Sequence, residues 1–258
     1  MVKGLYTAYT GMINEQNRMD IMTNNLANAS TVGYKKEGST SQSFDDVLTV
    51  KIKDQSVGMR NVQRLGVKNP GVKIGENYTD YSQGSFRITG NTYDLALSGE
   101  GFFAIEFTNK AGETDTKYTR AGQFTLNKDG YLVTEEGDYV LDTQNRRIRL
   151  NTLIDSSITD DGTIYQNGQA VAKIQVTDFE DYDYLEKYGE TYYQPIQGAK
   201  TIAAKAQVKS GYLEMANVQI VSEMVNLISI TRAYESNQKV VQTIDRSEEH
   251  TSELQSLV

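Results

Sequence analysis

Residues 213–244 read LEMANVQIVSEMVNLISITRAYESNQKVVQTI, a stretch in which apolar residues recur at regular intervals. An apolar or aromatic residue recurs at every seventh position along it: Leu213, Ile220, Leu227, Tyr234 and Val241. A period of seven residues is typical of a helix that buries one stripe against a partner helix. No Gly or Pro follows Gly211, so the pattern predicts one unbroken helix of about 32 residues, roughly 48 Å long. A helix of this length overhangs a small domain and therefore needs a partner helix.

The N-terminal end of the chain carries a matching pattern. Leu5, Met12, Met19 and Leu26 again lie seven residues apart, within a stretch from Met1 to about Tyr34. No Gly or Pro occurs between Met12 and Val32, and the pattern stops at the turn-rich run Asn28-Ala29-Ser30-Thr31-Val32-Gly33. The sequence therefore predicts a second long amphipathic helix at this end.

The two terminal helices can pair antiparallel, because the chain leaves them for a middle region and then returns. A single contact between two helices leaves much of each helix exposed to solvent, and an exposed apolar stripe indicates contacts with further protein subunits. The C-terminal stripe is broadened by such apolar residues: Val218, Val221, Met224, Val225 and Ile228. Repeated contacts between different patches of identical chains close into rings or grow as helical filaments. The periodicity thus predicts that the chain assembles with copies of itself.

The middle region, about 35–206, has the composition of antiparallel β-structure. Its candidate strands are Phe102–Phe107, Gln123–Leu126, Tyr131–Thr134, Arg147–Leu150 and Ile174–Thr177. Turn sequences separate them, among them Asn127-Lys128-Asp129-Gly130, Glu136-Gly137-Asp138, Asp160-Asp161-Gly162 and Asn167-Gly168. Asp-Gly and Asn-Gly between short β runs favour hairpins. Helical segments do not alternate with these strands, so a parallel βαβ sheet is disfavoured.

Together these patterns predict an α+β fold. The N- and C-terminal helices pair as a coiled-coil-like inner domain, and a mainly antiparallel all-β domain is inserted between them. The expected boundaries are 1–40 plus 207–258 for the helical domain, 41–74 for an extended linker, and 75–206 for the β domain.

The composition restricts the chemistry that the chain can perform. It has 258 residues, a formal net charge of −8, no Cys and one His, His250. An acidic chain without a basic run disfavours nucleic-acid binding. Without Cys, and with a single His, zinc sites and Ser-His-Asp catalysis are disfavoured. The first residues contain no apolar region of a cleaved signal peptide, and no run approaches the roughly 18 apolar residues of a membrane span. We expect no catalytic residues, cofactor or metal.

Three local patterns suggest other chemistry, and each has a simpler interpretation. Gly99-Glu100-Gly101-Phe102-Phe103 is a glycine loop, but no helix pattern follows it to receive a phosphate, so a tight strand start is favoured. A partial calcium loop has Thr125 at its first position and no flanking helices, which favours a hairpin turn; its other members are Asn127, Asp129, Gly130 and Glu136.

The third pattern is acidic. Its residues could form a carboxylate pair of the kind that cleaves glycans: Asp160, Asp161, Asp178, Glu180, Asp181 and Asp183. A secreted enzyme acting on cell-wall glycan stays open as an alternative on this ground, as does a surface binding module with an oligomerising stalk. A tyrosine cluster near these acids is interpreted as a domain surface or a subunit contact: Tyr182, Tyr184, Tyr188, Tyr192 and Tyr193.

Three further motifs, in order along the chain, resemble the flagellar axial protein family of rod, hook and hook-associated proteins. The N-terminal motif is Asn24, Asn25, Leu26, Ala27, Asn28, Thr31, Gly33, Tyr34 and Lys35. The middle motif includes Thr89-Gly90-Asn91, Gly99-Glu100-Gly101-Phe102-Phe103 and Tyr118-Thr119-Arg120-Ala121-Gly122. The C-terminal motif is Leu213, Glu214, Asn217, Val218, Glu223, Met224, Arg232, Ala233, Tyr234 and Glu235. Ala216 stands where the family often has Ser.

The resemblance implies a structural, non-enzymatic subunit of the flagellar basal-body rod. Such a subunit self-assembles helically into the hollow drive shaft that transmits torque from motor to hook. Length and the middle motif look most like distal rod subunits; proximal rod or hook-type subunits are the nearest alternatives. The implied partners are copies of itself, other rod and hook proteins, the flagellar type III export apparatus and surrounding ring proteins. The implied location is the basal body, reached by type III export without a cleaved signal peptide.

The assembly residues expected from the heptads are Leu5, Met12, Met19, Leu26, Leu213, Ile220, Leu227, Tyr234 and Val241. Arg232, Glu235 and Lys239 lie at helical spacing, and we expect them to pair between subunits and set their register. The tail 246–258 lacks the apolar positions that continue the family's helix and can be read as a translated sequencing-adapter oligonucleotide. We therefore expect that it replaces the native last turns.

Overall fold

The two heptad segments form the two helices of the computed structural model, α1 (Val2–Ala27) and α2 (Ile220–Ser256). The structure describes residues 2–52, 62–110 and 112–256. The chain divides into two units. The helical unit consists of Met1–Leu26, Glu37–Asp80 and Ile220–Val258, and the β unit consists of Ala27–Lys36 and Tyr81–Gln219. Paired terminal helices with mainly antiparallel strands between them confirm the predicted α+β fold.

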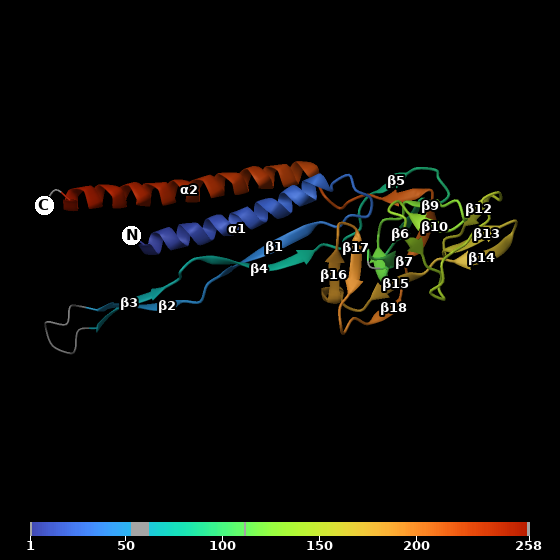
Figure 1. Ribbon diagram of the computed structural model, residues 1–258, viewed down its shortest axis with the longest axis horizontal. Coiled ribbons are helices and arrows are strands. Elements are labelled where there is room, and N and C mark those ends of the chain that lie inside the picture. The colour runs from blue at the N-terminus through green and yellow to red at the C-terminus, as the bar shows by residue number, and fades with distance from the viewer. Residues whose placement is uncertain (1, 53–61, 111, 257–258) are drawn as a thin grey trace. The chain divides into compact units, whose positions relative to one another are not determined.

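Helices α1 and α2 lie side by side and run in opposite directions (Figure 1). A Cβ added to Gly4 would lie 3.6 Å from Ile244 Cδ1, and one added to Gly11 would lie 3.1 Å from Asn237 Nδ2. Seven residues forward on α1 thus correspond to seven residues back on α2, as expected for a heptad seam. Ile230 is buried on the α2 side of the pair. Over the described residues, neither helix combines the length and apolar character that crossing a membrane requires.

Four strands complete the helical unit. β1 (Glu37–Ser43) pairs antiparallel with β4 (Val72–Thr79), and β2 (Val47–Ile52) pairs with β3 (Val62–Lys68). Polar contacts join this region to α1: Ser41 Oγ donates to Asn14 Oδ1 at 3.1 Å, and Thr7 Oγ1 donates to Pro70 O at 3.1 Å. In the segment 41–74, which the sequence predicts to be a linker, the described strand residues are extended but paired: 41–43 pair with 72–74, and 47–52 pair with 62–68.

The β unit is built around a nine-stranded sheet. Its main path has the order β16-β17-β8-β7-β11-β10-β9, and β15 joins β7 and carries β18 at its other edge. The strands of this sheet are β7 (Phe102–Thr108), β8 (Thr114–Thr119), β9 (Phe124–Leu126), β10 (Leu132–Thr134), β11 (Tyr139–Val140), β15 (Val176–Phe179), β16 (Leu185–Tyr188), β17 (Tyr192–Pro195) and β18 (Thr201–Ala203). A 3-10 helix, η1 (Tyr182–Tyr184), precedes β16.

Smaller sheets surround it. β12 (Ser156–Ile158), β13 (Thr163–Gln166) and β14 (Gln169–Lys173) form a three-stranded meander. β6 (Leu95–Ser98) pairs with β19 (Gln207–Ser210), and β5 (Phe86–Ile88) pairs with β20 (Tyr212–Glu214). The chain therefore brings its last strands, β19 and β20, back beside its early strands before α2 begins.

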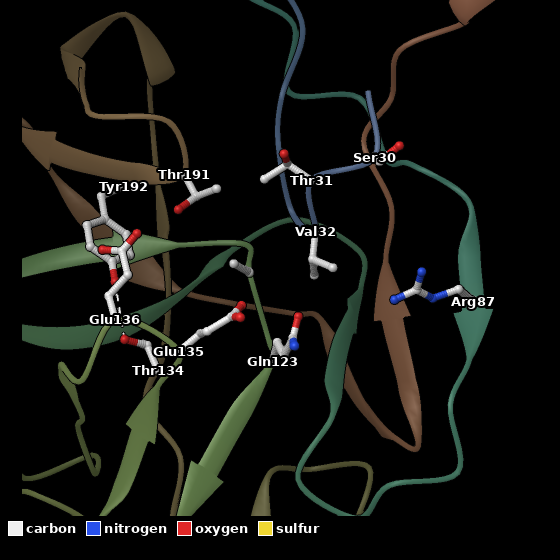
Figure 2. A pocket seen from close by; sticks show the side chains of 11 residues that line it. Ser30, Thr31, Val32, Arg87, Gln123, Thr134, Glu135, Glu136, Thr191 and Tyr192 are labelled. Carbon is white, nitrogen blue, oxygen red and sulfur yellow. Dashed lines mark hydrogen bonds between the residues drawn. The ribbon is translucent and has the colours of Figure 1, made fainter. Parts of the chain in front are cut away.

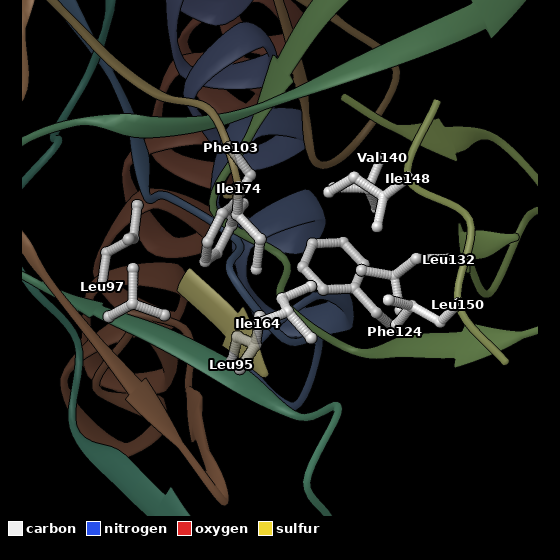
Figure 3. Close-up of a cluster of buried hydrophobic side chains, with 11 residues drawn as sticks. Leu95, Leu97, Phe103, Phe124, Leu132, Val140, Ile148, Leu150, Ile164 and Ile174 are labelled. Carbon is white, nitrogen blue, oxygen red and sulfur yellow. The ribbon is translucent and has the colours of Figure 1, made fainter. Parts of the chain in front are cut away.

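Two hydrophobic clusters form the core of the β unit. Figure 3 shows the larger one, in which Phe103 and Phe124 meet edge to face with ring centres 5.2 Å apart. The second cluster surrounds Phe102 on the other face of β7, because successive side chains of a strand point to opposite sides. Tyr192 and Tyr193 are buried at β17, so the expectation that the tyrosine cluster is a surface holds only for Tyr184 and Tyr188, which are exposed.

The predicted turns lie between strands. Asn167-Gly168 joins β13 to β14, and both residues have positive φ, 51° and 75°, as a type I′ hairpin requires. The turn 127–130 joins β9 to β10, and Glu136-Gly137-Asp138 lies between β10 and β11. Short dipeptide signals were sufficient here because they act through local backbone geometry alone.

α1 ends at Ala27, directly before the turn-rich run at which the sequence predicts its end, and Thr31 N donates to Asn28 O in that turn. The start of α2 differs from the sequence-based expectation. Leu213 is wrong as a helical heptad position: it lies in β20, pairs with Arg87 of β5 and is 2% exposed. The seven-residue spacing extends back to Leu213, although α2 begins only at Ile220. The stretch 207–219 accordingly belongs to the β unit and not with the terminal helices.

Candidate assembly face and motif junction

The heptad residues of the helices lie at the edge of the α1–α2 seam. Seven of them are half-buried in the single chain: Leu5, Met12, Met19, Leu26, Leu227, Tyr234 and Val241. Ile220, the first residue of α2, is 44% exposed. These side chains therefore keep apolar surface that the chain itself does not cover.

Other helix residues are buried. Among them are Ala8, Asn14 and Ile21 on α1, and Ile230 on α2. The intermediate heptad positions Ile230, Asn237 and Ile244 alternate with Leu227, Tyr234 and Val241 in steps of three and four. The seven-residue spacing alone identifies one line of a seam, and the three-and-four alternation of a full heptad would have identified the second.

A second assembly of motif residues lies in the β unit. We call it the motif junction, and it consists of Val32–Lys36 and Leu213–Asn217 with the residues bound to them. Gly33 N donates to Glu214 O at 2.8 Å, and Val32 forms a β-bridge with Met215. Lys36 N donates to Asn217 Oδ1 at 2.7 Å. The segment that follows α1 is thus hydrogen-bonded to the segment that precedes α2.

A buried ionic cluster forms the centre of the motif junction. Lys35, Arg120 and Glu214 are 1%, 3% and 0% exposed. Lys35 Nζ lies 2.6 Å from Glu214 Oε1, and an Arg120 terminal nitrogen lies 3.3 Å from Glu214 Oε2. Gly84 N also donates to Glu214 Oε1 at 3.0 Å, and Lys35 Nζ donates to the Ser82 carbonyl at 2.7 Å. Buried charges are tolerated only when paired and hydrogen-bonded in this way.

Gly33 is required at this place by its conformation and by its surroundings. Its φ is +70°, a region that side chains with a Cβ disfavour, and an added Cβ would collide with the backbone of Ala121. The glycine therefore lets the N-terminal motif approach the loop that carries Arg120. The sequence places these residues in motifs far apart, and only the folded chain brings them together.

The remaining motif residues have different positions. Asn25 Nδ2 donates to Glu37 O at 2.8 Å and its Oδ1 accepts from Glu37 N at 2.9 Å, so Asn25 fixes the start of β1 inside the helical unit. Tyr34 is fully buried, and Lys187 Nζ lies 4.3 Å from its ring centre. On α2, Glu223 is buried, whereas Met224, Arg232, Ala233 and Glu235 are exposed. The first residues of the C-terminal motif, Leu213–Asn217, thus belong to the motif junction, and its last residues lie on α2.

A pocket of about 460 Å³ lies beside the motif junction within the β unit (Figure 2). Ser30, Thr31 and Val32 of the N-terminal motif form part of its wall. Arg87 lies across it from Glu135 and Glu136, and the other lining residues are Ala121, Gln123, Thr134, Thr191 and Tyr192. Burial, followed by the hydrogen bond to Asp138, raises the pKa of the Tyr192 hydroxyl.

The patterns that suggested other chemistry have structural roles. Gly99 and Gly101 have φ of +118° and +133° at the start of β7, and no helix follows them. Asn127 Oδ1 accepts from Asp129 N and Tyr131 N, which closes the hairpin turn of the partial calcium loop. Across the described part of the chain, no three His, Asp or Glu side chains cluster as metal ligands would.

The acidic residues that could have formed a catalytic pair also have structural roles. The Thr159 hydroxyl, with Thr163, holds the pKa of the Asp161 carboxyl below its usual range, on an exposed hairpin tip. Asp178 is buried and accepts from the Tyr182 hydroxyl at 2.8 Å. A glycan-cleaving acid needs a raised pKa in a cleft. Asp161 instead accepts hydrogen bonds within a hairpin turn, and Asp178 of β15 holds the Tyr182 hydroxyl of η1.

Paired terminal helices joined to a β unit through motifs from both chain ends are the pattern of a flagellar axial subunit, and three family models match in that order. "Flagella basal body rod protein" matches residues 5–35, "Flagellar hook protein FlgE/F/G D1 domain" matches 96–168, and "Flagellar basal body rod FlgEFG protein C-terminal" matches 209–254. The three matched ranges contain most of both terminal helices, strands β7 to β11 of the sheet, and Val32–Lys35 and Leu213–Asn217 of the motif junction.

Full-length relatives agree with the family models. Flagellar basal-body rod protein FlgG of Bacillus subtilis strain 168 is 34% identical over 95% of this chain and 96% of its own length. FlgG of Caulobacter vibrioides is 34% identical over 99% and 100% of the two chains, and FlgF of the same organism is 32% identical over 93% of each. The chain belongs to the flagellar basal-body rod protein family. It is a structural rod protein of the flagellar basal body.

Proposed function

We propose that the chain is the distal rod subunit, which polymerises helically into the hollow shaft between motor and hook and transmits torque. The observation that carries this proposal is the apolar surface left open on the helix pair of a chain whose relatives named FlgG align with it from end to end. Exposed apolar stripes of this extent favour a protein interface.

The assembly residues of this proposal are the heptad side chains of both helices: Leu5, Met12, Met19, Leu26, Ile220, Leu227, Tyr234 and Val241. Leu213 is not among them, because the β unit already buries it. Contacts of one patch with a different patch on the next copy can repeat from copy to copy, and they give a helical filament whenever the rotation between copies does not close a ring. The helix pairs form the inner tube in this proposal, and the β units form its outer layer.

The proposed partners follow from this place in the flagellum. They are copies of the chain, neighbouring rod and hook proteins, the type III export apparatus that delivers the chain without a cleaved signal, and the surrounding ring proteins. Arg232 and Glu235 are exposed on α2 and are proposed to pair with charged residues of adjacent copies.

The central experiment compares two α2 variants. Leu227→Asp places a charge on the seam, and we expect it to abolish polymer formation while the β unit stays folded. Asn226→Asp is the matched control, because it adds the same charge one residue away on an exposed side of α2. Polymer is measured by sedimentation and electron microscopy, and the fold of the β unit by near-ultraviolet circular dichroism. Normal polymers of Leu227→Asp would refute the seam as the assembly element.

The position along the rod needs a separate experiment. A short epitope inserted at the Asn167-Gly168 turn, which ends an exposed hairpin, would mark the chain in isolated basal bodies. If the chain is the distal subunit, the epitope label should lie on the part of the rod nearest the hook. Label confined to the motor end would instead identify a proximal subunit.

A further inference from the structure

Three exposed apolar residues form one stripe on α1. Tyr6, Tyr9 and Ile13 are 51%, 51% and 40% exposed, and their spacing of three and four puts them on one face of the helix. We call them the α1 stripe. Other faces of α1 are occupied: Gly4 and Gly11 lie against α2, while Thr7 and Asn14 are hydrogen-bonded to the strand region.

A matching set lies near the start of α2. Val221, Val225 and Ile228 are 77%, 57% and 53% exposed, and they are separated by four and three residues. We call them the α2 stripe; exposed Met224 lies at its edge. Read in opposite directions, the two stripes have the same spacing. In an antiparallel pair, equal spacing in opposite directions lets side chains meet one to one.

Within one chain the two stripes cannot cover each other. The α1–α2 register places residue 4 opposite 244 and residue 11 opposite 237, so residue 9 lies opposite 239. Residue 225 lies opposite residue 23, which is about 14 residues, or about 21 Å, farther along α1 than Tyr9. Each stripe therefore needs a surface outside its own chain.

We propose that the α1 stripe of one copy packs against the α2 stripe of a second copy, so that Tyr6 meets Ile228, Tyr9 meets Val225 and Ile13 meets Val221. This inference rests on the proposed self-assembly and specifies its contact. The register between copies differs from the register within a chain by about 14 residues, which is two heptads. Adjacent copies are therefore offset by about 21 Å along the helix pair.

A second copy is the favoured occupant for two reasons. The shift is a whole number of heptads, so α2 of the second copy keeps the heptad phase of the seam already formed within each chain. The contact also joins different patches, so each bound pair of copies still presents one free α1 stripe and one free α2 stripe to further copies. Repetition of such a contact gives a ring or a helical filament, and a filament is what the proposed shaft requires.

The absence of Cys from the sequence allows a direct test with introduced cysteines. Full-length Tyr9→Cys and Val225→Cys chains are mixed, concentrated and oxidised, and covalent dimers are counted on non-reducing gels. A disulfide requires Cα atoms within about 7 Å, so only the proposed register brings these positions together. The matched control pairs Tyr9→Cys with Arg232→Cys, exposed one heptad away on α2. A Gly11→Cys/Asn237→Cys chain reports bonding within one molecule.

We expect at least tenfold more dimer from the Tyr9→Cys and Val225→Cys mixture than from the control mixture. Sedimentation of the same samples separates the two proposals. If the chains sediment as polymer but the control mixture gives as much dimer or more, the proposed register is wrong and the proposed self-assembly is still supported. A chain that stays monomeric at every concentration, without dimer, overturns both.

Discussion

Replacing Glu214 by Gln tests whether the ionic cluster stabilises the β unit. The substitution keeps the shape of the side chain but removes the carboxylate charge that pairs with Lys35 and Arg120, which are 1% and 3% exposed. Removing one partner from a buried ion pair costs about 3–5 kcal/mol, because the remaining charge stays desolvated. The Gln oxygen can still accept from Gly84 N, so we expect a loss of about 3 kcal/mol.

This loss is measurable by urea unfolding of the full-length chain. With a slope of about 2–3 kcal/mol/M, the midpoint should fall by about 1 M. Near-ultraviolet circular dichroism is a suitable signal, since most of the 17 Tyr residues lie in the β unit. The matched control is Glu106→Gln, which removes a carboxylate from a partly exposed pair with Arg147 and should cost below about 1 kcal/mol.

A second variant separates electrostatics from packing. Adding Lys35→Met to Glu214→Gln removes one of the two cations left without the carboxylate, so stability should partly return. The reasoning is refuted if Glu214→Gln costs no more than Glu106→Gln. It is equally refuted if the two substitutions simply add.

Three further outcomes follow from the β unit. Gly33→Ala should lower the free energy of unfolding by more than about 2 kcal/mol, because positive φ alone costs about 1–2 kcal/mol and the new Cβ meets Ala121. Tyr192 should destabilise the fold in alkali. Burial and Asp138 raise its pKa in the folded chain above the unfolded value of about 10, so its contribution is complete below pH 10 and is lost as pH rises above it. Tyr192→Phe should therefore flatten the fall of the urea midpoint above pH 10. Finally, a fragment of residues 27–219 should be a folded monomer by ultracentrifugation and circular dichroism, since both core clusters lie within it.

Each of these outcomes has a control and a contrary result. Gly137→Ala also has positive φ but open space around the Cβ, and an equal cost at both glycines would contradict the collision at Gly33. Tyr184→Phe removes an exposed hydroxyl, and an identical alkaline profile for both Tyr variants would contradict the role of burial. A fragment that is aggregated or lacks near-ultraviolet signal would show that the β unit depends on the terminal helices.

Local patterns were enough to predict several elements. The heptads of Leu5 to Leu26 and of Leu227 to Val241 lie on α1 and α2 because helical periodicity is a property of neighbouring residues. Asn167-Gly168 forms its hairpin for a similar reason, since the turn needs only two residues that tolerate positive φ. The family motifs likewise identified the class of protein without any knowledge of their contacts.

The same periodicity placed Leu213 on a helix, and here it was wrong. A spacing of seven does not show where a helix begins, and pairing with Arg87 in β5 decides that Leu213 is in a strand. The segment 41–74 was similarly ambiguous, because a linker and a hairpin have the same extended backbone until a partner strand is known.

Short-range patterns in the sequence suffice to predict two helical ends around a β-rich middle and a resemblance to flagellar axial proteins. The buried cluster of Lys35, Arg120 and Glu214 could be found only in the folded chain, since these residues are far apart along the sequence. The tertiary structure also decided the antiparallel register that leaves Tyr9 and Val225 uncovered. Which apolar residues remain for a partner depends on which ones the folded chain has already buried, and no local pattern contains that information.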